Sequence, residues 1–215
     1  MHSRLLEIPT RFETERLIVR SYEPGDGAWY YAIGKKNHDH LERYESGNVI
    51  FNLKSEEEAE NALIGMIADW NARNCFFMGA FEKISAVKTT AAVKNIASVK
   101  TTALQFVAQI YIGATNWDLP EFDIGYFVDV DHEGQGYVTE AVKGSLRFIF
   151  ENLQASRVRL ECDDTNVRSI RVAERCGFKR EAHIRENKLN RDGTISGTMI
   201  YGLLRREYLN LVKPG

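Results

Sequence analysis

The chain has 215 residues, of which 44% are hydrophobic and 27% are charged, and its formal net charge is −2. This balance is typical of globular domains, and it provides no global basic field that would favour nucleic acid or an anionic membrane as a partner. No apolar run reaches the roughly 18 residues of a membrane span, and the start lacks the apolar stretch of a signal peptide. We therefore expect a cytoplasmic protein with neither nucleic acid nor membrane as a partner. The spacing of Cys75, Cys162 and Cys176 fits neither a metal site nor a redox motif, which favours buried thiols.

The first expected elements are a strand over residues 16–22 and a short helix over 26–34, separated by a Pro/Gly turn. Residues 35–53 are polar and predict a loop. They include His38-Asp39-His40, a pattern that metal sites also use, but no second ligand pair stands nearby in the sequence. We therefore expect a solvated loop and no metal.

Ser55 to Glu58 form a capping box, which predicts the start of a helix. Its apolar stripe predicts a face that lies on a sheet, and it consists of Ala59, Ala62, Leu63, Met66, Ile67 and Trp70. Strands are expected over 76–83 and 106–113.

The segment 84–105 between these two strands contains an internal repeat. Residues 86–91, Ala-Val-Lys-Thr-Thr-Ala, recur as Ser-Val-Lys-Thr-Thr-Ala at 98–103. Two copies are too few for a solenoid, and the β-branched residues favour an extended hairpin arm. We expect one domain over residues 1–215 that carries this arm as an insertion. The arm is either a surface hairpin without function, or a cover for the active site or a contact to a second subunit.

Residues 122–138 form the most informative stretch. They predict a strand (122–130), a tight turn and a helix (136–153) whose apolar residues recur at three- and four-residue steps. Gly134 and Gly136 allow backbone angles that other residues avoid. Such a turn directs free N–H groups outward at the positive end of a helix dipole, where a phosphate or diphosphate binds. The alternative is a turn whose glycines serve packing alone.

The remaining elements complete a mixed sheet. We expect a strand over 157–163, a helix over 166–176 that ends at Gly177, and strands over 178–184 and 198–204. Strands and helices in this order predict an α/β (α+β) fold with helices on both faces of the sheet.

Two motifs resemble those of the GNAT superfamily of N-acyltransferases. Residues 123–128 and 132–141 resemble its acetyl-CoA-binding motif, and residues 166–178, Asn-Val-Arg-Ser-Ile-Arg-Val-Ala-Glu-Arg-Cys-Gly-Phe, resemble its next motif. The likeness extends from about Thr14 to Glu207 and is greatest to the RimJ/RimL branch, which acetylates ribosomal-protein N-termini and other amines. It implies a mostly antiparallel GNAT-like sheet whose fourth and fifth strands splay around the cofactor's pantetheine. The family usually has a short turn where this chain has residues 84–105.

The resemblance implies a cofactor site for acetyl-CoA as co-substrate. The turn residues expected to bind the diphosphate through their N–H groups are Gly134, Gln135, Gly136, Tyr137 and Val138. Glu133 stands where the family has Gln or Arg, and Val138 where it has Gly or Ala; we expect the Glu133 carboxylate to point to solvent. A backbone N–H of Val128 or Val130 would polarise the thioester carbonyl. Asn166 would bind the pantetheine amides.

The catalytic residues are expected on the later strands and the second motif. Glu161 is the first candidate for the base and Glu186 the second; either is equally suited to pair with a neighbouring arginine. Ser169 matches the family serine beside the cofactor sulfur and would protonate the thiolate, unless it only caps its helix. Some relatives use a tyrosine where this chain has Ala173, and Tyr201 is the alternative here.

The resemblance implies an acetyl-CoA-dependent N-acetyltransferase in which an amine attacks the thioester directly. The acceptor is a protein N-terminus, such as that of a ribosomal protein, or a small-molecule amine, and Tyr44 and Phe51 are candidates for its pocket. A catalytically silent acyl-CoA-binding module and an unrelated phosphate-binding α/β domain are the alternatives. Assembly as a homodimer stays open.

Overall fold

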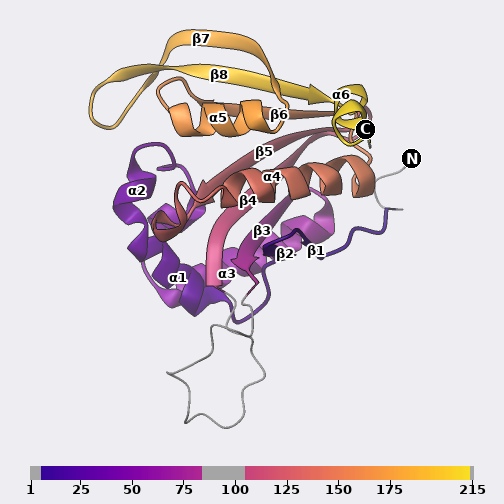
Figure 1. Cartoon of the computed structure of the whole chain (residues 1–215). Coiled ribbons are helices and arrows are strands. Elements are labelled where there is room, and N and C mark those ends of the chain that lie inside the picture. Colours follow the sequence, from indigo (N-terminus) through magenta and orange to yellow (C-terminus); the bar gives the residue numbers. More distant parts are fainter. Residues whose placement is uncertain (1–5, 84–104, 214–215) are drawn as a thin grey trace.

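The computed structural model describes residues 6–83 and 105–213, and its centre is one eight-stranded sheet (Figure 1). The strands lie in the order β1-β2-β3-β4-β5-β6-β8-β7. Every neighbouring pair is antiparallel except β5 and β6, which are parallel. The strands are β1 (Arg11–Glu13), β2 (Leu17–Ser21), β3 (Cys75–Glu82), β4 (Gln105–Asn116), β5 (Glu121–Val128), β6 (Arg157–Asp163), β7 (Lys179–Leu189) and β8 (Ile195–Leu204). The predicted mixed, mostly antiparallel fold is confirmed.

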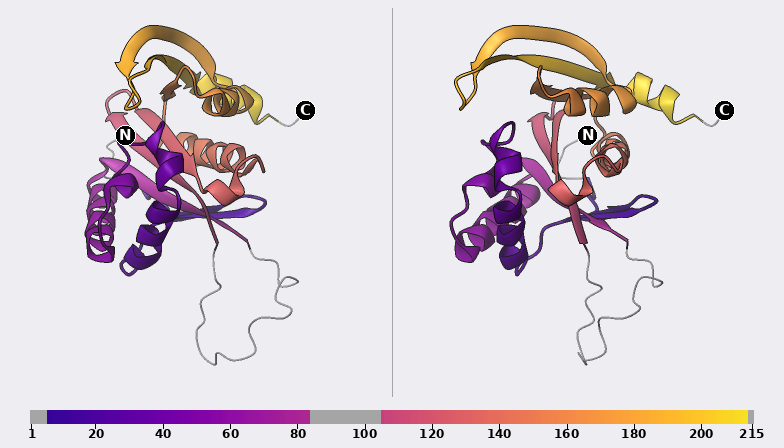
Figure 2. Two further views of the ribbon diagram at one scale, coloured as in Figure 1. Left: turned by 90° about the vertical axis from the view of Figure 1, so that its left-hand side faces the viewer. Right: turned by 60° about the vertical axis from the view of Figure 1, so that its left-hand side comes forward.

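Helices cover both faces of the sheet. Figure 2 shows α1 and α3 on one side of the central strands and α4 on the other. The helical elements are α1 (Gly27–Lys36), α2 (His38–Glu42), η2 (Val49–Asn52), α3 (Glu56–Ala72), η4 (Val130–His132), α4 (Tyr137–Arg147), η5 (Phe148–Asn152), α5 (Val167–Arg175) and α6 (Arg205–Leu211). None of the helices in residues 6–83 and 105–213 combines the length and apolar character that a membrane crossing requires.

The two faces of the sheet bury separate hydrophobic clusters. On one face, α4 and η5 pack on the strands around Phe76, Phe122 and Phe148. On the other, α1 and α3 pack around Tyr30 and Phe81. β4 contacts both clusters, which is why residues 106–110 are buried without interruption. This rigid double layer fixes the position of β5, the strand that leads into the glycine turn.

β5 and β6 separate after a short contact. They pair only from Glu121 with Arg157 to Asp123 with Arg159. Beyond that point β6 continues with β8 and β7 as a separate three-stranded wing, while β5 stays with β4. Figure 1 shows the wing above the rest of the sheet, with α5 beneath it. The predicted splay of the central strands is therefore present.

The capped helix forms as predicted. The Ser55 side chain accepts a hydrogen bond from the Glu58 backbone N–H (3.1 Å) and begins α3. The Glu58 carboxylate accepts from the Lys54 backbone N–H, one residue earlier than a standard capping box has it. Ala59, Leu63, Met66 and Trp70 are buried, so the helix lies on the sheet through the expected stripe.

The prediction of a loop over 35–53 is wrong. This segment contains the two short helices α2 and η2, because Leu41, Ile50 and Phe51 are buried and draw the polar residues between them into turns. The sequence does not reveal α2, because this five-residue helix buries only Leu41 and a single buried residue gives no hydrophobic period.

Other boundaries also differ. The strand predicted over 122–130 ends at Val128, and the helix predicted over 136–153 is α-helical to Arg147 and π-helical over η5. The last two strands are longer than predicted, and β1 and α6 were not predicted. The hairpin arm predicted at 84–105 lies outside the described residues, apart from Gln105.

Candidate functional site

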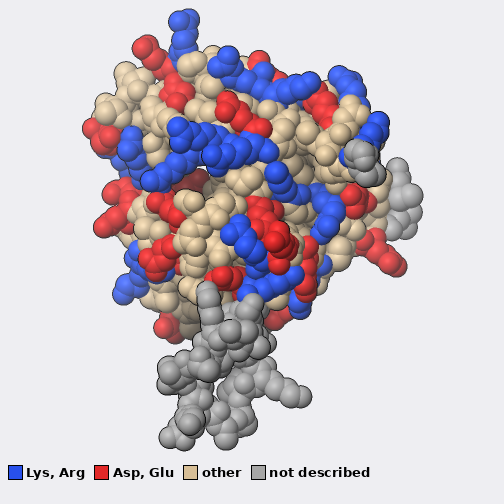
Figure 3. Space-filling model, in the orientation of Figure 1, with Lys and Arg blue, Asp and Glu red and all other residues tan. Residues whose placement is uncertain are grey.

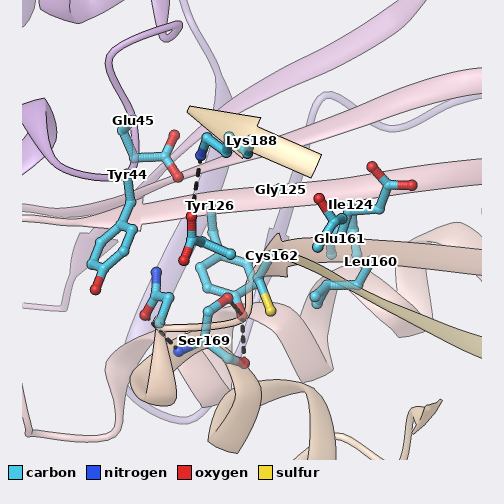
Figure 4. A pocket seen from close by; sticks show the side chains of 13 residues that line it. Tyr44, Glu45, Ile124, Gly125, Tyr126, Leu160, Glu161, Cys162, Ser169 and Lys188 are labelled. Carbon is cyan, nitrogen blue, oxygen red and sulfur yellow. Dashed lines mark hydrogen bonds and ion pairs between the residues drawn. The ribbon is translucent and has the colours of Figure 1, made fainter. Parts of the chain in front are cut away.

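A pocket of about 240 Å³ fills the gap where β5 and β6 separate. Its walls come from β5, β6, α5, the β7–β8 wing and the segment after α2 (Figure 4). The lining residues are Tyr44, Glu45, Ile124, Gly125, Tyr126, Leu160, Glu161, Cys162, Asp163, Asn166, Ser169, Lys188 and Thr198. Among the residues that the structure describes, no cluster of three or more His, Cys, Asp or Glu side chains is arranged to hold a metal.

The backbone of β5 presents unpaired groups to this gap. The Asp129 N–H donates to the Val107 carbonyl (2.8 Å), so Val128 and Ala108 are a non-hydrogen-bonded antiparallel pair. The N–H of Val128 therefore points away from β4, toward the side that β6 has left. The N–H of Val130, the other predicted carbonyl-polarising group, donates to the Asn37 side chain (2.7 Å). Within residues 6–83 and 105–213, the Val128 N–H therefore has no acceptor and can bind a ligand oxygen, whereas the Val130 N–H is already bound.

The glycine turn has the backbone conformation of an anion site. Gly134 and Gly136 have φ values of +72° and +80°, a region that favours glycine, and Gly136 precedes the first turn of α4. Within the described residues, no protein acceptor receives a hydrogen bond from the backbone N–H groups of residues 134–138. These donors lie at the positive end of the α4 dipole, where a phosphate group is stabilised.

Contacts on the far side of the turn fix its shape. The Arg16 side chain donates to the Gln135 carbonyl (3.1 Å) and lies over the Tyr137 ring. The Tyr137 hydroxyl donates to Glu82 (2.8 Å), and Val138 packs against the core. The side chains of these turn residues therefore serve its structure, while their N–H groups stay available.

Glu133 does not point to solvent, contrary to the expectation. Its carboxylate forms an ion pair with Arg168 of α5, and His40 Nε2 lies 3.4 Å from the same oxygen. Arg168 reaches across from the helix that follows the splay, so the ion pair joins the turn to α5. The physical reason is the proximity of two opposite charges at a partly buried position, where screening is weaker than in water.

Asn166 and Ser169 lie side by side at the start of α5. The Asn166 side chain caps the helix by accepting from the Ser169 backbone N–H (3.1 Å). Both residues also line the pocket, so capping and pocket roles coexist. Ser169 Oγ lies 2.9 Å from the Tyr126 hydroxyl, which comes from β5. Burial raises the pKa of Tyr126, so this hydroxyl stays protonated.

Cys162 lies in the same part of the pocket as Ser169 (Figure 4). Burial raises the pKa of its thiol to about 11, against a smaller opposing effect of the Ser169 hydroxyl. A thiol with this pKa is almost entirely protonated near neutral pH and is a poor nucleophile.

A carboxylate and an ammonium group occupy another part of the pocket. Figure 4 shows Glu45 and Lys188 close together, away from Cys162. Burial raises the pKa of the Glu45 carboxyl to about 7, while the Asn48 amide and the Lys188 charge lower it less. Lys188 Nζ lies 3.4 Å from Oδ2 of Asp163, a buried carboxylate that also accepts from Ser196 (2.6 Å). Glu45 is therefore a carboxyl group that changes charge near neutral pH.

Of the four predicted catalytic residues, the structure places two in the pocket and two outside it. Glu161 and Ser169 line the pocket, but the Glu161 side chain is 44% exposed and lies 3.5 Å from Arg159. Glu186 is exposed, in a bulged part of β7 at φ +51°, and is not a lining residue. Tyr201 is buried in the core and does not line the pocket either.

Of the two residues predicted for the acceptor pocket, one lines the pocket and the other does not. Tyr44 lines the pocket, and its hydroxyl lies 3.4 Å from the Thr165 carbonyl. Phe51 is buried beneath the His38 ring and the Arg191 guanidinium and does not line the pocket.

Glu45 and Tyr126 are pocket residues that the sequence did not indicate. Tyr126 shares a strand face with Ile124 and Val128, so strand alternation alone could have placed it in the gap. Glu45 follows Tyr44 in a segment without periodicity, and no local pattern marks it. Its position depends on the turn that Leu41 and Asn48 fix through backbone bonds to Glu45.

Comparisons with known proteins agree with this geometry. A family model described as Acetyltransferase (GNAT) domain matches residues 16–179. The protein named "Probable N-acetyltransferase YjcK" of Bacillus subtilis is 40% identical over 68 residues, which are 31% of this chain and 38% of YjcK. The chain spans less than half the length of the curated relatives it matches.

Two solved structures have a similar fold. RimJ of Mycobacterium smegmatis, in complex with CoA-disulfide, has a TM-score of 0.75 at 20% identity, over 96% of this chain and 91% of that chain. The ribosomal-protein-S5-alanine acetyltransferase of Vibrio fischeri has a TM-score of 0.74 at 16% identity, over 96% of this chain and 100% of that chain. The family model covers the glycine turn, the splayed strands and α5, and the chain therefore belongs to the GNAT acetyltransferase family.

Proposed function

We propose that the protein transfers an acetyl group from acetyl-CoA to a primary amine, which attacks the thioester directly. The observation that carries this proposal is the pocket between β5 and β6. The edge of β5 and several titratable side chains line this pocket, and the chain runs on from β5 into the glycine turn. Family membership and the coenzyme A complex of the RimJ structure support the choice of cofactor.

Three parts of the chain would hold acetyl-CoA. The N–H groups of residues 134–138 bind the diphosphate. The free edge of β5 pairs with the amide groups of the pantetheine, and the Asn166 carboxamide NH₂ donates to them from the opposite wall. This arrangement directs the thioester into the pocket, toward Ser169.

The Val128 N–H polarises the thioester carbonyl. It is a fixed donor on a strand buried between two layers, so it stabilises the developing oxyanion without reorganising. A donor of this kind contributes roughly 3 kcal/mol to transition-state stabilisation. Val130 does not contribute, because Asn37 already accepts its N–H.

Glu45 accepts the proton of the attacking amine, directly or through water. Only the neutral amine is a nucleophile, and a base with a pKa of about 7 is half ionised at neutral pH. Lys188 favours the ionised form of Glu45 and, held by Asp163, keeps this side of the pocket polar. Glu161 is the second candidate, since it lines the pocket but is more exposed.

Tyr126 and Ser169 protonate the departing thiolate. Their hydroxyls are hydrogen-bonded, so one can donate to the sulfur while the other replaces the proton. Tyr126 thereby takes the place of the tyrosine that the helix lacks at Ala173. The nitrogen–carbon bond forms as the carbon–sulfur bond breaks. The amine proton goes to Glu45, the sulfur takes a proton from the hydroxyl pair, and the proton on Glu45 returns to the pair through water.

The acceptor is an amine of a protein N-terminus. Support comes from the similar solved structure that is named for ribosomal-protein-S5 alanine. A small-molecule amine is the alternative acceptor.

The experiment is a panel of amine acceptors offered together with acetyl-CoA. It includes peptides with different N-terminal residues, the same peptides with a blocked N-terminus, polyamines and free amino acids. We expect amine-dependent release of free CoA and an acetylated peptide by mass spectrometry, with no release from the blocked peptides. Binding of acetyl-CoA without CoA release for any amine would favour a silent acyl-CoA-binding module.

A further inference from the structure

The cofactor turn of this chain begins with a charge of the wrong sign. Glu133 occupies the position where the family motif has Gln or Arg, directly before the N–H groups of residues 134–138. A carboxylate at that position repels a diphosphate bound to the turn. A cation from elsewhere in the chain has to compensate it for the turn to bind an anion well.

Arg168 is the cation that meets this requirement. Its Nη1 forms the ion pair with Glu133, and this contact holds the guanidinium beside the turn. In the part of the chain that the structure describes, Nε and Nη2 of Arg168 have no acceptor. The remaining N–H groups are therefore available to a second anion while Glu133 keeps the first contact.

The surface around this ion pair is basic. Figure 3 shows a band of lysine and arginine side chains across the region where Figure 1 places α5, above α4. α5 carries three exposed arginines, Arg168, Arg171 and Arg175. Of the three, Arg168 is the one that forms an ion pair with Glu133, while Arg175 lines a second hollow together with Gly136. A planar guanidinium also matches phosphate oxygens in geometry better than an ammonium group does.

We propose that Arg168, positioned by Glu133, binds the diphosphate of acetyl-CoA over the glycine turn. It takes the role of the Gln or Arg side chain that this chain lacks at position 133. This inference rests on the proposed function, because it assigns residues to its cofactor. Glu133 is a positioning residue: it aims the guanidinium and, once neutralised by it, no longer repels the phosphates. The site thus selects thioesters that carry a diphosphate over shorter ones.

The test compares acetyl-CoA with acetyl-pantetheine, the same thioester without the diphosphate and nucleotide. Kinetics are measured at saturating amine for Arg168→Gln, Glu133→Gln, the double variant and Arg171→Gln. The last variant is the matched control, because it removes the same charge from the same helix without touching the turn. Melting temperatures verify that each variant is folded.

We expect Arg168→Gln to raise KM for acetyl-CoA about tenfold or more, because a charge-assisted phosphate contact is lost. KM for acetyl-pantetheine should stay within about twofold of the wild-type value. Adding Glu133→Gln should recover part of the loss, since the unpaired carboxylate is then gone. Arg171→Gln should change neither KM by more than about twofold. Equal effects on both thioesters would show a structural role, and equal effects of the two arginine variants would show a general surface field; either result overturns the proposal.

Calorimetric binding of CoA and pantetheine gives the same comparison without turnover. If no amine is acetylated, the proposed function fails, but the two binding constants still decide the role of Arg168. A tenfold weaker binding of CoA to Arg168→Gln with unchanged pantetheine binding supports it, and unchanged CoA binding contradicts it.

Discussion

The Tyr126 hydroxyl lies 2.9 Å from Ser169 Oγ, across the gap between β5 and α5. The two residues are 43 positions apart in the chain and meet only because the strands splay. In the proposed reaction this pair supplies the proton for the thiolate.

Tyr126→Phe should lower kcat by about tenfold to a hundredfold and change KM for acetyl-CoA little, because the hydroxyl acts mainly on the leaving group. Ser169→Ala should have a similar effect, and the double variant should be little worse than either single one, since the two act as a unit. Tyr201→Phe is the control, because Tyr201 does not line the pocket. If Tyr201→Phe reduces kcat more than Tyr126→Phe does, the assignment of the acid is wrong.

Glu45→Gln should reduce the rate about a hundredfold near pH 7, where the wild-type carboxyl is half ionised. The wild-type rate should rise with pH through about 7 and then level off, as Glu45 loses its proton. In the variant this step should disappear, and the rate should recover only at higher pH, where the amine is neutral without a base.

Glu161→Gln and Glu186→Gln serve as comparisons for this pH profile. The Glu161 side chain lines the pocket but is 44% exposed, so a smaller loss is expected for its variant, and Glu186→Gln should retain the wild-type rate. A loss confined to Glu161→Gln would move the base to that residue. Normal rates for all three at pH 7 would mean that the proton leaves to water.

The raised pKa of Glu45 also predicts a pH-dependent effect on stability. The folded protein binds this proton more tightly than the unfolded chain, whose ordinary pKa is 4.5. The raised pKa of Glu45 therefore has no pH-dependent cost below pH 4.5; the cost grows between pH 4.5 and about 7 and is constant above that. The melting temperature of Glu45→Gln relative to wild type should increase over this window and then level off, as thermal scans would reveal. A difference that does not change with pH would mean that the pKa is not raised.

Gly136→Asp should abolish the thermal shift that acetyl-CoA produces in the wild type. The change places a side chain and a negative charge where the diphosphate binds, at a backbone position of φ +80°. Gly25→Asp, at φ +97° in a turn outside the pocket, is the matched control for backbone strain. A normal shift in the Gly136 variant would place the cofactor elsewhere.

Much of the fold follows from local patterns that the sequence displays. The stripe from Ala59 to Trp70, the cap at Ser55 and the strand–glycine turn–helix at 122–138 each depend on neighbours within a few residues, so periodicity and turn chemistry predict them. The motif at Asn166 and Ser169 likewise placed both residues in the pocket.

The rest depends on contacts between distant parts of the chain. Glu45 enters the pocket because Leu41 anchors α2, and the direction of Glu133 depends on Arg168, 35 residues later. Strand register leaves the Val128 N–H available, and Asn37 occupies the N–H of Val130. None of these relationships leaves a periodic signal in the sequence.

The central claim, direct transfer from acetyl-CoA to the amine within this pocket, is tested most directly by intact-mass spectrometry in a single turnover. Protein is mixed with acetyl-CoA alone, and the peptide acceptor is then added. We predict an unmodified protein before the amine is added, since the pKa of the Cys162 thiol is raised to about 11, and an acetylated peptide afterwards. An acetyl group on the protein that forms before the amine is added and then passes to the peptide would contradict direct attack, and its location at Cys162 would make that thiol the nucleophile.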